Sequence, residues 1–148
     1  MPAVHSLIRE LAQYEKAPGE VTNTPEAMVK DGFGPNPVFH CQVAESEGKV
    51  IGMAIYFVKY STWKGKGVYL DDIVVTEAFR KKGVGRKLLD AVIRHSHELK
   101  VNQLHWQVLD WNTPAIEFYK KYDVQFDSEW INCKMTKQAI EDYLKSVQ

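Results

Sequence analysis

The sequence predicts one α/β (α+β) domain in which a mixed sheet is flanked by helices on both faces. The expected elements follow the order helix, helix, strand, strand, strand, helix, strand, helix, strand, helix. Three consecutive strands followed by strand–helix–strand connections indicate a mixed sheet, and the last two connections should be right-handed. With 148 residues, the chain is long enough for one buried core and too short for two, so we expect residues 1–148 to form a single domain.

Two helices are expected before the first strand. Residues 2–14 carry apolar side chains at helical spacing, and the stretch "APGEV" then breaks the pattern. A shorter helix follows, with Thr24 as its N-cap, Pro25 at its first position and Gly32 as its stop signal.

Strands are expected where apolar or alternating runs lie between turn residues. These runs are residues 38–45, 49–60, 68–75, 103–109 and 129–135. The helix between the third and fourth strands has an apolar face formed by Leu88, Leu89, Val92, Ile93 and Leu99. Two further helices are expected at residues 112–122 and 136–147, before and after the last strand.

The composition excludes several classes of protein. Hydrophobic residues make up 45% of the chain and charged residues 26%, which is typical of a globular protein. Nineteen cations balance nineteen anions, so no bulk charge favours a nucleic acid or a membrane surface as partner. The longest apolar run, residues 50–58, is too short to span a membrane. Cys41 and Cys133 lack a disulfide framework, which favours a reducing, cytoplasmic setting.

Three histidines, His40, His95 and His97, do not predict a metal site. His95 and His97 are two residues apart on a helix, so their side chains do not face each other. The chain also lacks an H-E-x-x-H motif. We therefore expect chemistry without a metal.

A basic loop with two glycines precedes the central helix. Gly83 and Gly85 remove side chains where a backbone can approach a ligand, and the first turn of the helix offers N–H groups that suit a phosphate. Five cations surround the glycines: Arg80, Lys81, Lys82, Arg86 and Lys87. The loop is neither a P-loop nor a dinucleotide fingerprint, since the position three after Gly85 is Leu88. From spacing alone, a phosphate site and a solvated basic turn are equal alternatives.

The stretch Arg80–Gly85 ("RKKGVG") resembles the R/Q-x-x-G-x-G/A acetyl-CoA motif of the GNAT N-acetyltransferases. Around it, "LIRELAQYE", "DGFG", "HCQVAE", "YLDDIVV" and "LDWNTPAIEFYKK" resemble the spermidine/spermine (diamine) acetyltransferase family. The pieces "YSTWKG" and "LDWN" are similar to its thialysine-acetylating branch. The resemblance extends from about Leu7 to Tyr122. It implies a mostly antiparallel sheet, acetyl-CoA as co-substrate and a homodimer.

The resemblance also implies which residues contact acetyl-CoA. They are Ile73, Val74, Val75, Arg80, Lys81, Lys82, Gly83, Val84, Gly85, Arg86, Asn112, Thr113, Pro114, Ala115 and Tyr119. Tyr119 matches the family's proton donor, because a phenol O–H beside the thioester sulfur can protonate the departing thiolate. From the residues alone, Phe118 and Tyr119 would more often be core packing.

Two adjacent carboxylates, Asp71 and Asp72, interrupt the apolar third strand. Because successive side chains of a strand alternate, we expect them to point to opposite faces of the sheet. A solvated pair near the strand's end is the competing interpretation. By resemblance, Asp71 stands where the family has a glutamate that binds the cationic amine and relays its proton. The same resemblance assigns further substrate contacts to Tyr14, Glu15, His105, Trp106 and Gln107.

Together these features predict an N-acetyltransferase that moves acetyl directly from acetyl-CoA to a small primary amine, polyamine-like or thialysine-like, in a ternary complex. Two alternatives stay open: a protein-lysine acetyltransferase on the same fold, and a non-catalytic acyl-CoA-binding module. The chain departs from the family at several places, two of which concern the sheet and the amine site. Only Met1 precedes Pro2, so either the sheet lacks the family's first strand or the sequence begins late. Asp71 is also one methylene shorter than the family's glutamate.

Overall fold

The computed structural model describes residues 1–147, which form two compact units, 1–107 and 108–147. Within these described residues, the first unit contains a four-stranded sheet with the strand order β1–β2–β3–β4. The strands are β1 (His40–Ser46), β2 (Lys49–Ser61), β3 (Gly65–Val75) and β4 (Gln103–His105). The pairs β1–β2 and β2–β3 are antiparallel, and β3–β4 is parallel. The predicted mixed, mostly antiparallel sheet is confirmed.

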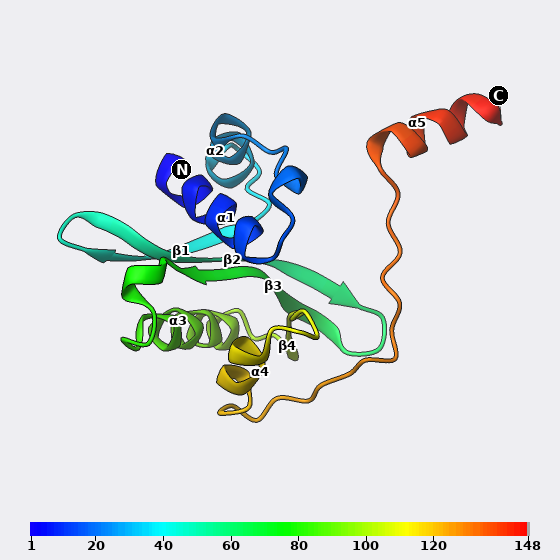
Figure 1. Cartoon of the computed structure of the whole chain (residues 1–148). Helices are drawn as coiled ribbons and strands as arrows, with labels where there is room; N and C mark the ends of the chain where they lie inside the picture. The colour runs from blue at the N-terminus through cyan, green and yellow to red at the C-terminus, as the bar shows by residue number, and fades with distance from the viewer. Residues whose placement is uncertain (148) are drawn as a thin grey trace. The chain divides into compact units, whose positions relative to one another are not determined.

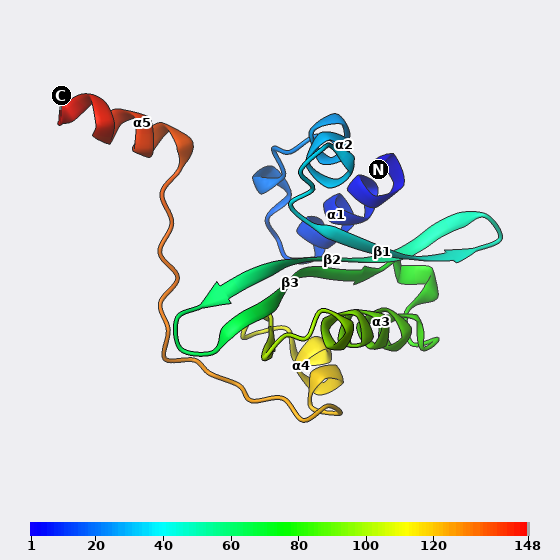
Figure 2. The same cartoon turned by 180° about the vertical axis from the view of Figure 1, so that it is seen from behind.

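Helices cover both faces of this sheet, as predicted. In Figure 1, α1 (Pro2–Tyr14) and α2 (Pro25–Phe33) lie on one face and α3 (Val84–Glu98) lies on the other. Figure 2 shows the same arrangement from behind. Two short 3₁₀ turns, η1 (Pro18–Glu20) and η2 (Glu77–Phe79), precede α2 and α3. We call the two sides of the sheet the α1/α2 face and the α3 face.

Local sequence signals explain where α2 begins and ends. The Thr24 hydroxyl accepts a hydrogen bond from the Ala27 N–H at 3.2 Å, and Pro25 stands at the first helical position. The helix runs to Phe33, one residue beyond the expected stop at Gly32, and its C-cap is Gly34. The expected N-cap is therefore confirmed, and the expected end is short by one residue.

Apolar packing holds the first unit together on both faces of the sheet. On the α1/α2 face, a buried cluster joins the two helices to β2 and β3: Val4, Leu7, Met28, Met53, Ile55 and Val74. On the α3 face, Tyr56, Val68, Leu70, Leu89 and Val92 are all at most 1% exposed. Each fully buried Leu or Val side chain contributes about 1.5–3 kcal/mol. The sheet is thus anchored from both sides, which gives the polar residues on it a rigid base.

The second unit contains α4 (Thr113–Tyr119) and α5 (Lys137–Ser146). Side chains cap both helices: Asn112 accepts from the Ala115 N–H at 3.3 Å, and Thr136 accepts from the Ala139 N–H at 3.1 Å. The expected fifth strand at residues 129–135 is wrong, because this segment has no strand conformation in the described chain. A strand forms only beside a hydrogen-bonding neighbour, and every residue of this segment is exposed.

Candidate active site

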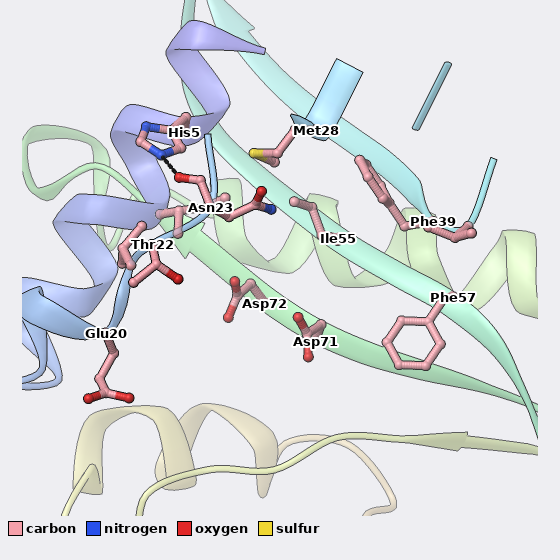
Figure 3. A pocket seen from close by; sticks show the side chains of 13 residues that line it. His5, Glu20, Thr22, Asn23, Met28, Phe39, Ile55, Phe57, Asp71 and Asp72 are labelled. Carbon is pink, nitrogen blue, oxygen red and sulfur yellow. Dashed lines mark hydrogen bonds between the residues drawn. The ribbon is translucent and has the colours of Figure 1, made fainter. Parts of the chain in front are cut away.

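A pocket of about 410 Å³ lies on the α1/α2 face of the first unit. Side chains from α1, α2 and the segments after each of these helices line it, together with side chains from β2 and β3 (Figure 3). Its apolar wall consists of Ile8, Val21, Met28, Val38, Phe39, Ile55 and Phe57. Its polar lining consists of His5, Glu20, Thr22, Asn23, Asp71 and Asp72. The lining residues therefore include three carboxylates and neither lysine nor arginine.

Asp71 and Asp72 both face this pocket because β3 has a bulge at Asp71. Ile55 of β2 pairs with Asp72, whereas Tyr56 pairs with Leu70, which leaves Asp71 as an extra residue in the ladder. The expectation that the two side chains point to opposite faces is therefore wrong. Figure 3 shows both carboxylates on the pocket side of β3. The extra residue shifts the alternation of side chains along β3 by one position, so both carboxylates line the same pocket.

The bulge also coincides with the end of β4. This strand pairs only with residues 67–69 of β3, so it ends at His105 instead of at residue 109, as the sequence suggested. A bulge disrupts the neighbouring ladder, which explains why the pairing ends just before Asp71. Beyond Tyr69, β3 has a paired strand on one side only.

Burial raises the pKa of the carboxyls near the bulge. For Asp72 the pKa rises to about 6, first through burial and then through the negative charges of Asp71 and Glu15. For Asp71 and Glu15 the pKa is also raised, and burial is the cause in both. Glu15, which directly follows α1, therefore lies close enough to Asp72 to repel its charge. A carboxyl with a pKa of about 6 is mostly ionised at neutral pH, yet it accepts a proton far more readily than an ordinary Asp.

Two of the predicted substrate-contacting residues are held around Tyr69 of β3. The Tyr69 hydroxyl donates to Gln107 Oε1 at 3.0 Å, and its ring packs edge-on against the His105 ring, with 5.2 Å between centroids. Lys59 Nζ donates to His105 Nδ1 at 2.9 Å. Burial and the charge of Lys59 lower the pKa of His105, so its ring stays neutral at physiological pH. His105 is therefore an acceptor and a packing surface here, not a cation.

Tyr69 connects these residues to the carboxylates. Its pKa is raised by burial and then by the negative charges of Asp71 and Asp72. Trp106 is half-buried, whereas His105 and Gln107 on either side of it are exposed. Tyr14, at the end of α1, is also exposed. Three predicted substrate contacts are therefore connected to Asp71 and Asp72: Glu15 through its charge, and His105 and Gln107 through their contacts with Tyr69.

The pocket also contains residues that the sequence did not single out. His5 Nε2 donates to the Asn23 carbonyl at 2.9 Å, which ties α1 to the segment before α2. Phe57 packs against Tyr69 across the strand pair, with 5.4 Å between ring centroids. His5 stands three residues before Ile8, so helical spacing could have placed both on one face of α1. Asn23 contributes through its backbone carbonyl, for which the sequence holds no signal.

The glycine loop leads from β3 into α3. Gly83 is the N-cap of α3, with φ 79° in the left-handed region, and no side chain caps this helix. A Cβ atom on Gly83 would meet nothing within 4 Å, and one on Gly85 would touch only Val75 Cγ2, at 3.8 Å. The start of α3 is therefore open, and its first-turn N–H groups can receive an anion.

The cations around the glycines differ in their contacts. Lys81 and Lys82 are exposed, and Arg86 forms a solvent-exposed ion pair with Asp90 at 3.8 Å. Arg80 is instead hydrogen-bonded to groups of the protein. The five cations that the sequence places together are thus not equivalent.

Tyr119 and the segment 112–115 belong to the second unit. Asn112 is the N-cap of α4, and Pro114 lies in its first turn. Tyr119 is the last residue of α4; it is 6% exposed, and its ring lies 5.3 Å from that of Phe118. The helix is present where it was expected, and the proton-donor role of Tyr119 stays a prediction.

Among residues 1–147, no group of three or more His, Cys, Asp or Glu side chains is arranged to hold a metal ion. This part of the chain also contains no helix with the length and hydrophobicity that a membrane crossing requires.

The fold and the loop define the class of protein. The model of the acetyltransferase (GNAT) family matches residues 3–123, so this chain belongs to that family and is an N-acetyltransferase. Solved structures share the fold. An integron cassette protein from the mobile metagenome of V. cholerae has a TM-score of 0.76 at 19% identity, over 97% of this chain and 90% of that one. An aminoglycoside N-acetyltransferase in complex with CoA has a TM-score of 0.68 at 18% identity, over 92% of each chain.

In sequence, the chain is similar to the thialysine N-epsilon-acetyltransferase of Bos taurus, at 42% identity over 80% of this chain and 75% of that protein. It is 38% identical to the thialysine N-epsilon-acetyltransferase of Mus musculus, over 92% of this chain and 86% of the relative. It is also 30% identical to the spermidine/spermine N(1)-acetyltransferase-like protein 1 of Homo sapiens, over 95% of this chain and 22% of that protein. The resemblance stated from the motifs is confirmed.

Proposed function

We propose that this protein transfers an acetyl group from acetyl-CoA to a small primary amine, of the polyamine or thialysine type, in a ternary complex. The observation that carries the proposal is the pocket into which the β3 bulge directs both Asp71 and Asp72. A site with three carboxylates and no lysine or arginine attracts a cationic amine. The similarity to thialysine acetyltransferases supports this choice of substrate.

The amine must lose a proton before it attacks. A lysine-like amine at neutral pH is deprotonated in only about one molecule in a few thousand. Asp72, with a pKa of about 6, is the better proton acceptor of the pair, because burial and the neighbouring charges disfavour its ionised form. We assign the base role to Asp72, acting directly or through one water, and the ammonium-holding role to Asp71.

Transfer then requires a polarised carbonyl and a protonated leaving group. The amine nitrogen bonds to the thioester carbon, the C–S bond breaks, and the thiolate takes a proton. We assign the polarising contact to backbone N–H groups in residues 73–75, where β3 has no paired β4 residue on one side. The phenol of Tyr119 is the proposed proton donor, which its match to the family's tyrosine supports.

The loop before α3 suits the pyrophosphate of CoA. The space in front of Gly83 is open, no side chain caps α3, and Lys81, Lys82 and Arg86 supply positive charge nearby. The GNAT family membership and the CoA complex of a protein with the same fold support this assignment.

A protein-lysine acetyltransferase is the competing function. Such an enzyme needs an open groove for a peptide. The pocket here has a volume of about 410 Å³ and a wall that includes Met28, Phe39 and Phe57. A concave site of this size with an apolar wall favours a small molecule.

The proposal is tested by measuring the thiol released from acetyl-CoA with diamines, polyamines, thialysine and a lysine-containing peptide. We expect release with the small amines and none with the peptide. Tyr119→Phe keeps the ring but removes the O–H, and should lower turnover by about 10²–10⁴-fold with acetyl-CoA affinity little changed. The proposed function would be contradicted if thiol were released with the peptide and with none of the small amines. It would also be contradicted if none of the tested acceptors released thiol. A Tyr119→Phe variant with native turnover would make Tyr119 a packing residue.

We also propose that the protein is a homodimer, as the family resemblance implies. On α5, Ile140, Tyr143 and Leu144 are exposed and follow helical spacing. An exposed apolar face of this kind favours packing against another surface. Sedimentation equilibrium should give twice the mass of one chain, and a monomer at micromolar concentration would contradict this assignment.

A further inference from the structure

Arg80 lies where three elements of the first unit meet. Its Nε–H donates to the carbonyl of Val75, the last residue of β3, at 2.9 Å. Its Nη2 donates to Glu10 Oε1 of α1 at 3.2 Å, and its guanidinium lies 5.3 Å from the centre of the Tyr14 ring. Arg80 itself belongs to the loop that leads to α3. One side chain therefore contacts the end of β3 and the amine-side helix from within the glycine loop.

Glu10 is the centre of this network. Its carboxylate accepts the Thr76 hydroxyl at Oε2 at 3.0 Å, and the backbone N–H of Glu77 at Oε1 at 3.0 Å. With Arg80, it therefore receives three donors from the segment between β3 and α3. The Glu77 N–H is in the first turn of η2, so Glu10 also caps that turn from another element.

We infer that Glu10, Thr76, the Glu77 N–H and Arg80, together the Glu10–Arg80 clamp, set the position of the amine pocket relative to the acetyl-CoA loop. In this inference Arg80 is a positioning residue and not a phosphate ligand. The inference rests on the proposed function, since it takes the pocket as the amine site and the loop as the acetyl-CoA site.

The elements that the clamp joins are those that carry the proposed chemistry. α1 contributes His5 and Ile8 to the pocket, and Glu15 directly after it raises the pKa of Asp72. Asp72 lies three residues before Val75 on β3. A shift of α1 against β3 therefore changes both the pocket wall and the charge environment of the proposed base. Small errors in the alignment of two substrates are costly, because reacting atoms must meet within a narrow range of distance and angle.

The geometry of the guanidinium also argues against a phosphate role. Its planar fork already directs donors at the Val75 carbonyl and at the Glu10 carboxylate. A phosphate bound to the same fork would lie beside a carboxylate and would be repelled by it. Lys81, which is exposed, can supply charge to the pyrophosphate without breaking such a contact, and Lys82 would exchange a cation–π contact with the Phe79 ring, 5.0 Å away.

The clamp contributes to orientation more than to stability. The Arg80 and Glu10 side chains are 37% and 32% exposed, and ion pairs at such exposure add little to the free energy of folding. Variants of the clamp should therefore fold, which makes their kinetics interpretable.

The test compares Arg80→Lys, Arg80→Gln, Glu10→Ala and the double variant Glu10→Ala/Arg80→Gln. Lysine keeps the charge but cannot bond to Val75 and Glu10 as a planar fork does. We expect all three single variants to lower kcat by about 10- to 100-fold, and the double variant to be no slower than the slower single one. Lys49→Gln, which removes an exposed cation at the turn between β1 and β2, is the control and should behave as wild type.

A phosphate role for Arg80 leads to the opposite pattern. Arg80→Lys would then retain near-native activity, Arg80→Gln would weaken acetyl-CoA binding with a smaller salt dependence, and Glu10→Ala would have no effect. That pattern overturns the clamp.

Amide hydrogen exchange separates the clamp from the proposed function, because it needs no substrate. The Glu77 amide should exchange faster in both Glu10→Ala and Arg80→Lys than in wild type. Faster exchange in Glu10→Ala alone would show that Arg80 does not hold the turn, and would overturn the inference. A wild-type protein that acetylates no amine would refute the proposed function and leave the exchange result standing.

Discussion

The two faces of the sheet in the first unit treat their polar groups differently. On the α3 face, the Tyr56 hydroxyl accepts a hydrogen bond from Gln42 Nε2 at 3.1 Å and lies 2.8 Å from His95 Nδ1. On the α1/α2 face, neither Asp71 nor Asp72 has a hydrogen bond or ion pair with another side chain among residues 1–147. Asp71 is exposed and Asp72 is half-buried, so both carboxylates are accessible to a cation. The Tyr56 hydroxyl thus has its partners within the protein, although Ser96 Oγ of α3 is buried without a hydrogen-bond partner among the described residues. On the α1/α2 face, the two carboxylates stay available to the proposed amine.

This contrast predicts that substitutions on the α3 face change stability and that substitutions at the bulge change activity. The largest effect is expected for Asp72→Asn, which keeps the shape of the side chain and removes its basicity. Turnover should fall by about 10²–10⁴-fold, as for the loss of a general base. In wild type, kcat/KM should rise with pH through about 6, the pKa of Asp72, and the variant should lose this dependence. A pH profile that is the same in both proteins would remove Asp72 from the base role.

The same variant should not lose stability at neutral pH. The pKa of Asp72 is raised from 3.8 to about 6 in the folded chain, so the folded state binds more protons than the unfolded state between these values. The contribution of this group to stability is therefore present below about pH 4 and lost as the pH rises through 6. Asp72→Asn should be at least as stable as wild type at pH 7.5, with a smaller advantage at pH 4, measured by urea unfolding.

The next largest effect is expected on the opposite face. Leu89 is fully buried on α3, and Leu89→Ala should lower the free energy of unfolding by about 2–5 kcal/mol through lost contacts and a cavity. Activity per folded molecule should stay near native, because the residue lies on the α3 face. Chemical denaturation combined with an activity assay below the transition checks this. If Leu89→Ala kept native stability but lost activity, the proposed separation of stability and activity between the two faces of the sheet would be wrong.

A smaller effect is expected for Asp71, since its side chain is more exposed to solvent than that of Asp72, although enough of it is covered to raise its pKa. Asp71→Asn should lower kcat/KM for cationic amines by up to about fivefold, the range of exposed charge pairs. Asp71→Glu restores the residue that the family resemblance implies, and should change the preference between diamines and thialysine more than the rate. Identical kinetics for all three proteins across both substrates would assign the ammonium-holding role elsewhere, with Glu15 as the next candidate.

The smallest effect is expected from the histidine pair on the α3 face. His40 stacks on Tyr56, with 5.4 Å between ring centroids, and lies 4.8 Å from the His95 ring. Its pKa is lowered by burial and then by the charge of His95. The unfolded chain therefore binds more protons just below pH 6.5, and stability should fall as the pH drops from that value. His40→Gln should flatten this slope between pH 7 and pH 5.5, and an unchanged slope would contradict the assignment.

The contrast also marks what the sequence could predict. The helix limits followed from local signals, such as the Thr24 N-cap with Pro25 behind it. The α3 face followed from the helical spacing of Leu88, Leu89 and Val92, two of which are fully buried. These features depend on a few neighbouring residues and on the regular spacing of apolar residues in a helix, so they can be predicted from the sequence alone.

The features that escaped prediction depend on contacts between distant segments. The ordinary alternation of a strand would place Asp71 and Asp72 on opposite faces, and only the pairing of β3 with Ile55 and Tyr56 of β2 reveals that Asp71 is an extra residue. The clamp partner of Arg80 lies 70 positions earlier in the chain. Residues 129–135 have the composition of a strand but no paired neighbour in the described chain, so composition misled there.

The bulge has a consequence for how readily this enzyme could acquire a new acceptor. Asp71 faces no residue of β2, while the residues before and after it keep their partners in the ladder. The side chain at this position therefore contributes little to packing between the strands. A substitution there should leave the strand register intact. At most active-site positions the same side chain affects both substrate preference and stability, so a substitution that improves one often lowers the other. Because the ammonium-holding role proposed for Asp71 is separate from the packing of the strand, we expect substitutions at position 71 to change acceptor preference and to leave the fold intact.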